Sequence, residues 1–255
     1  MSTETVCPKC GGTRWIIIER NGVSGAEPCE CRFEGRAERI ESRAQIPPLY
    51  AEASFDNFVV PGPENPIARR ELTNVRLSVL AYVREFPNPT RPGLLLIGEP
   101  GSGKTHLAVA AVHKIMEKGF ECMFCDYQNL LDRIRSGYDP NSNSSDKEAY
   151  REALDSEVLL LDDLGAHRVT DWVEDTITSI ITYRCNHRKP LIATTNLPDA
   201  DAGSAVVQRG PLGVEYRKTL ADHVGPRARS RLFEMCTVIK MPAVPDYRLR
   251  KAKTF

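Results

Sequence analysis

One segment of the sequence constrains the fold more than any other. Residues 98–108 read GEPGSGKTHLA, between the apolar run GLLLI at residues 93–97 and a segment whose apolar residues recur at helical spacing. Such a glycine-rich turn lets backbone amides face phosphate oxygens, and the helix that follows presents its positive N-terminal end to them. The sequence therefore predicts a phosphate-binding loop between a strand and a helix of an α/β fold.

Each residue of this loop has an expected part in holding a nucleotide. Lys104 is expected to reach the β and γ phosphates, and the Thr105 hydroxyl to ligate Mg²⁺. His106, inside the helix, is expected to pack near the nucleotide. The full set of loop residues expected to bind nucleotide is Gly98, Glu99, Pro100, Gly101, Ser102, Gly103, Lys104 and Thr105.

The rest of the chain alternates between predicted strands and helices. Strands are expected at 93–97, 120–126, 157–163, 190–196 and 236–241, and helices at 67–86, 104–118, 127–135, about 170–187 and about 226–234. Continuous apolar strands separated by helices predict a mainly parallel sheet that is covered on both faces. The polar tract 136–147 is expected to be a mobile loop, and residues 197–213 an irregular region.

Polar side chains end two of these predicted strands. Asp162 and Asp163 end the strand 157–163, and Asn196 ends the strand 190–196. Ligands of an open α/β sheet bind beyond the carboxyl ends of its strands. We therefore expect Asp162 to be the Mg²⁺ partner, Asp163 to polarise an attacking water, and Asn196 to reach the γ phosphate or that water. Without the phosphate-binding loop, each would be interpreted as a turn residue.

Arginines concentrate in the predicted helix near residues 226–234. Arg227 and Arg231 are four residues apart in PRARSRL and so share one helix face. An arginine donated into a neighbouring subunit's site would stabilise the charge that develops on a transferred phosphoryl group. A solvated basic helix is the alternative that the sequence alone leaves open.

The first residues of the chain carry a cysteine pattern typical of metal sites. The motifs CPKC, which two glycines follow, and CEC are separated by an 18-residue spacer. Four thiolates can close a tetrahedral zinc site, and a head this short would depend on the metal for its folding. Unliganded reduced thiols are the alternative. The expected zinc ligands are Cys7, Cys10, Cys29 and Cys31.

Charge and hydropathy exclude some classes of function. Lys plus Arg and Asp plus Glu number 34 each, so no overall field attracts the chain to nucleic acid or to an anionic membrane. Any contact with DNA must be local. No apolar stretch reaches about 18 residues, and the first residues do not resemble a signal peptide. We therefore expect a soluble, cytoplasmic protein with no membrane partner.

Taken together, the motifs resemble those of a known family. GEPGSGKT, LLLDDLG, TTN and the SRL arginine are similar to the Walker A, Walker B, sensor 1 and arginine-finger elements of AAA+ ATPases. Over about residues 50–245, the sequence most resembles the DnaC/DnaI-like helicase loaders and the related IstB-type transposition helpers. The segments that carry this resemblance are GSGKTHLA, LLLDDLGAHRVTDW, IATTNLP and SRLFEMC. The resemblance implies a three-layer AAA+ sandwich that binds ATP and Mg²⁺ and hydrolyses ATP.

The resemblance also implies roles for individual residues. Arg231 would act in trans on the ATP bound by a neighbouring subunit, with Arg227 as a second candidate, so that subunits associate through the ATP site. Many AAA+ proteins carry Glu where this chain has Asp163. With the shorter carboxylate, we expect hydrolysis to be slow and stimulated by a partner. The remaining roles are nucleotide and Mg²⁺ binding by Lys104 and Thr105, metal and water binding by Asp162 and Asp163, and γ-phosphate sensing by Asn196.

Partners follow from the same resemblance. Loaders of this group use a separate N-terminal domain to hold a replicative ring helicase, while the AAA+ part contacts single-stranded DNA. The expected domains are a zinc-binding head at 1–31, a helical connector and Pro-rich linker at 32–66, the ATPase domain at 67–245 and a basic tail at 246–255. An IstB-like transposition helper and a nucleotide-gated adaptor with little hydrolysis are the alternative functions. A small-molecule kinase would need an acceptor pocket and a basic lid, which the sequence does not reveal.

Overall fold

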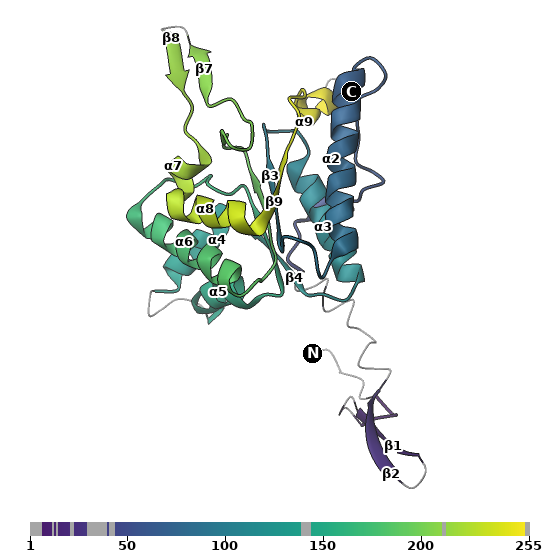
Figure 1. Cartoon of the computed structure of the whole chain (residues 1–255). Coiled ribbons are helices and arrows are strands. Elements are labelled where there is room, and N and C mark those ends of the chain that lie inside the picture. The colour runs from purple at the N-terminus through teal and green to yellow at the C-terminus, as the bar shows by residue number, and fades with distance from the viewer. Residues whose placement is uncertain are drawn as a thin grey trace.

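A parallel five-stranded sheet forms the centre of the fold (Figure 1). The computed structural model describes residues 7–252, apart from 12, 14, 21–22, 30–39, 41–43, 139–143 and 211–212. The strand order is β4-β5-β6-β3-β9. The strands are β3 (Gly93–Ile97), β4 (Cys122–Asp126), β5 (Val158–Asp162), β6 (Leu191–Thr195) and β9 (Cys236–Lys240). The predicted parallel sheet is confirmed, and each of the five predicted strands is present.

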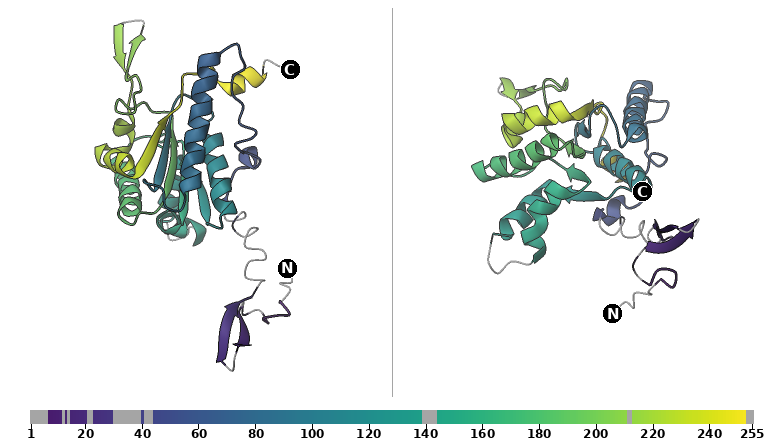
Figure 2. Two further views of the ribbon diagram at one scale, coloured as in Figure 1. Left: turned by 45° about the vertical axis from the view of Figure 1, so that its right-hand side comes forward. Right: turned by 60° about the horizontal axis from the view of Figure 1, so that its bottom comes forward.

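Helices cover both faces of this sheet (Figures 1 and 2). Leu94 and Leu96 pack with α2 (Pro66–Glu85) and α3 (Lys104–Glu117), because alternate residues of a strand face opposite sides. Leu95 and Ile97 pack on the other face. The helices there are α4 (Tyr127–Ser136), α5 (Ser144–Asp155), α6 (Asp171–Asn186) and α8 (Pro226–Met235). The three-layer sandwich is confirmed. No helix in the described part of the chain is both long and apolar enough to cross a bilayer.

The polar tract at residues 136–147 was predicted as a mobile loop, and this prediction is wrong at its end. Helix α5 begins at Ser144 and continues to Asp155. Its buried positions include Ala149 and Ala153, four residues apart. Alanine contributes little to an apolar pattern, so the inward face of this helix is hard to recognise in a polar sequence.

The region 197–213 is more regular than predicted. Strands β7 (Val207–Gly210) and β8 (Gly213–Tyr216) pair in antiparallel register and project from the body of the protein in Figure 1. A short helix, α7 (Leu220–Val224), follows. Thr219 and Asp222 cap its start reciprocally, as a capping box, which offsets its short length.

The Pro-rich stretch 46–66 packs against the helices on one face of the sheet. It contains a 3-10 helix, η2 (Pro48–Tyr50), and then buries Phe55 and Phe58 in the core formed with α2 and α3. The His113 ring bonds to the Ala53 carbonyl at 2.8 Å. This contact to α3 goes beyond the predicted extended linker.

The N-terminal head contains a hairpin that the sequence pattern did not reveal. Strands β1 (Trp15–Arg20) and β2 (Val23–Pro28) pair antiparallel and lie away from the sheet in Figures 1 and 2. The hairpin brings Cys29 back toward Cys7 and Cys10. Most of the connector at 32–45 lies outside the described residues. The predicted domain boundaries stay predictions.

A fully buried arginine holds the segments that lead into β5 and β6, at the amino-terminal edge of the sheet. Arg184 on α6 has no exposed surface, and burial lowers its pKa to about 10. Its guanidinium donates hydrogen bonds of 2.5 to 3.4 Å to backbone carbonyls. The acceptors are the carbonyls of Ala153, Leu154, Ser156, Glu157 and Pro190.

Replacing Arg184 with methionine is expected to lower the free energy of unfolding by about 3 kcal/mol, because several buried carbonyls lose their donor at once. Urea denaturation followed by circular dichroism measures the change. Arg168→Met, at an exposed position, serves as the control and should alter stability by less than about 0.5 kcal/mol. Equal stabilities of the two variants would contradict a structural role for Arg184.

Candidate nucleotide-binding site

The predicted phosphate-binding loop joins β3 to α3. Gly101 and Gly103 have φ of 72° and 94°, in the left-handed region that favours glycine. A Cβ at Gly103 would lie 2.6 Å from Cε2 of Phe58, so glycine is also required there by the close approach of that ring. The loop therefore has the backbone conformation that turns successive amides toward one side.

Asp162 lies at the carboxyl end of β5, where two hydroxyls converge on it. Its Oδ1 accepts hydrogen bonds from Thr194 Oγ1 at 2.6 Å and from Thr105 Oγ1 at 3.0 Å. Burial raises the pKa of this carboxyl, although the bond from Thr194 opposes the shift. A hydroxyl and a carboxylate held side by side are oxygen ligands of the kind that Mg²⁺ prefers. These residues fit the predicted metal.

Lys104 begins α3 and points into the same site. Its Nζ donates to Asn196 Oδ1 at 2.6 Å and to the Glu99 carbonyl at 3.0 Å. Asn196 Nδ2 in turn donates to Asp163 Oδ1 at 3.1 Å. Burial lowers the pKa of Lys104, whereas the nearby Asp163 and Asp162 carboxylates oppose that shift. The structure thus brings Lys104, Asn196 and both carboxylates together, although they lie far apart in the sequence.

Thr194 positions this group from β6, and the sequence analysis assigned it no role. Its hydroxyl accepts the Asp163 N–H at 3.0 Å, and its carbonyl accepts the Leu164 N–H at 2.8 Å. These bonds hold Asp163 at a φ of 53°. Thr194 precedes Asn196 by two residues, so the period of a strand puts both on one side. This two-residue spacing was the sequence signal that could have identified Thr194.

The stretch 46–66 supplies neighbours of the site that the sequence did not signal. Burial raises the pKa of the Tyr50 phenol, and the Thr105 side chain beside it opposes that shift. His106 Nε2 bonds to the Ser54 carbonyl at 2.9 Å, and the His106 ring lies 5.6 Å from that of Phe58. His106 therefore anchors the stretch to α3. Its predicted proximity to the nucleotide stays a prediction.

The arginines of α8 divide between two surroundings. Arg229 forms a bidentate pair with buried Asp199 at 2.6 and 2.7 Å and also bonds to Asp201, which commits it to its own chain. Arg227 and Arg231 line one groove between α6 and α8, which confirms that they share a face. In the described parts of the chain, no hydrogen bond or ion pair joins either of them to the Lys104 site.

Three of the four predicted zinc ligands come together in the head. The Sγ atoms of Cys7, Cys10 and Cys29 lie within 4.8 Å of one another, and those of Cys7 and Cys29 are 3.9 Å apart. Tetrahedral zinc with bonds of about 2.3 Å separates two sulfurs by about 3.8 Å. Cys31 lies outside the described residues. The geometry of the three thiols fits zinc.

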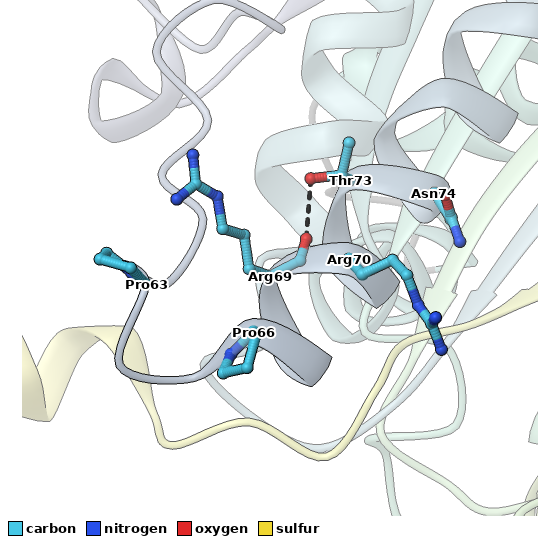
Figure 3. Close-up of a pocket in the computed structure, with 6 residues that line it drawn as sticks. All are labelled: Pro63, Pro66, Arg69, Arg70, Thr73 and Asn74. Carbon is cyan, nitrogen blue, oxygen red and sulfur yellow. Dashed lines mark hydrogen bonds between the residues drawn. The ribbon is translucent and has the colours of Figure 1, made fainter.

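A hollow at the start of α2 is separate from these sites (Figure 3). It is lined by Pro63, Pro66, Arg69, Arg70, Thr73 and Asn74. Thr73 Oγ1 donates to the Arg69 carbonyl at 2.7 Å, within the helix. The two guanidinium groups point to different sides in Figure 3 and do not converge on one anion position.

Comparisons with known proteins support a nucleotide-binding site in this chain. Residues 65–209, more than half of the chain, match the family described as IstB-like ATP binding protein. Among curated proteins, the uncharacterized protein YqaM of Bacillus subtilis is 27% identical over 179 residues, which cover 68% of this chain and 55% of YqaM. The chain thus spans about half the length of YqaM. The replicative helicase loader DnaC of Escherichia coli is 22% identical over 184 residues, covering 70% of this chain and 71% of DnaC.

A solved structure gives a further similarity. The crystal structure of the DnaC helicase loader is 30% identical and superposes with a TM-score of 0.60. The match covers 77% of this chain and 100% of that one. The similarity thus extends over sequence and fold together.

Proposed function

The chain belongs to the family of IstB-like ATP-binding proteins, with an AAA+ fold, and from this premise we propose that it hydrolyses ATP. One observation carries the proposal. Lys104, Asn196 and Asp163 form a continuous hydrogen-bonded series at the carboxyl edge of the sheet, beside the Thr105–Asp162 pair. Phosphoryl transfer to water needs a cation that binds phosphate, a pair of oxygens that binds the metal and a carboxylate that accepts a proton from water.

Thr105 and Asp162 would hold Mg²⁺, which when bound neutralises charge on the phosphates. Lys104 binds the β and γ phosphates and exchanges its bond to Asn196 for one to phosphate. Gly98 through Gly103 supply backbone amides to the same oxygens. These contacts orient the γ phosphate toward Asp163.

Asp163 and Asn196 then act on the attacking water. The Asp163 carboxylate accepts a proton from this water, and Asn196, which already donates to Asp163, fixes the direction of that carboxylate. Arg231 acts on the site of a neighbouring subunit, with Arg227 beside it in the same groove as the second candidate. Hydrolysis then depends on assembly.

We propose further that this ATPase loads a replicative ring helicase onto single-stranded DNA. The similarity to replicative helicase loader DnaC in sequence and to the DnaC crystal structure supports the proposal. In this function the head at 1–31 holds the helicase and the ATPase domain at 67–245 contacts DNA. The match to the IstB-like family favours a transposition helper as the second candidate.

Affinity capture with the Asp163→Asn variant and ATP distinguishes these two functions, because a slowed ATPase keeps its partners. Recovery of a hexameric replicative helicase supports loading, and recovery of a transposase supports the second candidate. Lys104→Ala is the nucleotide-free control, and Cys7→Ser tests whether the head holds the partner. Capture that is the same with Lys104→Ala and Asp163→Asn would contradict an ATP-dependent loader.

We also propose that the head binds zinc through Cys7, Cys10, Cys29 and Cys31. Elemental analysis of purified protein is expected to give about one zinc per chain, and Cys29→Ser to lose it. Cys185→Ser, which changes a cysteine on α6, is the control and should keep the metal. Metal-free protein with a protease-resistant head would contradict the proposal.

A further inference from the structure

The residues after β9 run across the phosphate-binding loop. The Met241 N–H donates to the Ile97 carbonyl at 2.7 Å, and a Cβ at Gly98 would lie 2.5 Å from Cβ of Met241. Farther along, the Tyr247 N–H donates to the Gly101 carbonyl at 3.2 Å. Tyr247 begins a short helix, α9 (Tyr247–Ala252). The residues after β9 therefore contact the loop at Gly98 and at Gly101, and the predicted basic tail begins at the second of these contacts.

Between these two points, a carboxylate lies against the loop. A Cβ added to Gly101 would collide with the carboxylate of Asp246. The Asp246 side chain is only 23% exposed. The loop backbone is shaped to receive anionic phosphate, so the group that lies on it here has the same sign of charge as the expected ligand.

Arg248 holds Asp246 in this position. Asp246 Oδ1 accepts the Arg248 backbone N–H at 2.8 Å and its Nε at 3.3 Å. The hydrogen bond from the Arg248 side chain lowers the pKa of Asp246, which favours the charged carboxylate. The segment therefore places the Asp246 carboxylate against the loop as part of an ion pair, in which the positive charge of Arg248 lies close enough to the site to lower the pKa of Lys104.

We propose that Asp246–Leu249 is an autoinhibitory clasp, which occupies the phosphate-binding loop until a nucleoside triphosphate displaces the Asp246 carboxylate. The proposal rests on the ATP site described above. The phosphates and Asp246 repel one another across the same few loop atoms, so they bind in competition. Displacement of Asp246 also breaks the Tyr247–Gly101 hydrogen bond and frees the segment. ATP then controls whether the end of the chain is docked or exposed.

The test measures affinity for a fluorescent ATP analogue in the full chain. Asp246→Asn keeps the shape of the side chain and removes its charge, so the dissociation constant is expected to fall about fivefold or more. Glu117→Gln removes an exposed carboxylate from the far end of α3 and should leave the constant unchanged. Hydrogen exchange provides a second measurement, in which ATP is expected to speed exchange of the Tyr247 amide in the wild-type protein.

The outcomes separate the clasp from the ATP site on which it rests. Normal ATP binding by the wild-type protein, with equal affinity in Asp246→Asn and an unchanged Tyr247 amide, overturns the clasp and leaves the ATPase proposal intact. Failure of the wild-type protein to bind ATP contradicts both. Tighter binding in Asp246→Asn together with faster Tyr247 exchange supports the clasp.

Discussion

Replacing Arg231 with alanine is expected to lower the rate of ATP hydrolysis by about 10³-fold, the scale on which an arginine supplied in trans acts in nucleotide hydrolases. The Arg231 side chain is 42% exposed and pairs within its own helix with Glu234, at 2.6 Å. Such an exposed pair is weak and exchanges readily for phosphate. Phosphate release, followed over a range of protein concentrations, measures the effect, because the wild-type rate per chain should rise as subunits associate.

Two further variants are needed to interpret the effect of Arg231→Ala on turnover. Arg168→Ala removes an exposed arginine outside the groove and should leave turnover unchanged. Arg227→Ala tests the second candidate, and a larger loss there than in Arg231→Ala would transfer the role to Arg227. Full turnover in both groove variants, at a rate independent of concentration, would show that no arginine acts in trans.

Lys104→Ala is expected to weaken ATP binding by about 30- to 150-fold, since one charge-assisted contact to phosphate is worth roughly 2 to 3 kcal/mol. Lys104 is only 5% exposed and lies between Asn196 and the Glu99 carbonyl, so no other described cation occupies its place. Isothermal titration with ATP and Mg²⁺ measures the change.

Lys114→Ala is the matched control for Lys104, because it removes an exposed lysine from the same helix. Lys114 pairs with Glu117 at 2.8 Å near the end of α3. We expect its ATP affinity to match that of the wild-type protein. If Lys104→Ala bound ATP as tightly as this control, the loop would not be the phosphate site.

The sheet and its two helix layers could be predicted because parallel strands are buried on both faces. Runs such as GLLLI and VLLLD carry that burial directly in the sequence. Helix α5, which begins inside the predicted loop 136–147, was not predicted because its inward positions, Ala149 and Ala153, are small. The sequences of β7 and β8, VQRG and GVEY, show no clear alternation, and Val207 and Tyr216, which pair at one end of this hairpin, are exposed.

The residues of the candidate site likewise include some that the sequence predicted and some that it did not. Lys104, Thr105, Asp162 and Asn196 were identifiable because loop spacing and strand ends define positions along the chain. Tyr50 was not, because it reaches Thr105 from a stretch whose prolines indicate only the absence of helix. The contact between Asp246 and Gly101 joins two distant segments through one glycine, and only the fold brings them together.

Identification of the nucleotide that stays bound tests ATP hydrolysis at this site most directly. Wild-type protein and Asp163→Asn are each incubated with ATP and Mg²⁺, separated from free nucleotide, and denatured so that the bound nucleotide can be analysed. We predict ADP from the wild-type protein and ATP from Asp163→Asn, because the amide keeps the oxygen that Asn196 contacts but cannot accept a proton from water. The same yield of ADP from both proteins would contradict a role for Asp163 in hydrolysis.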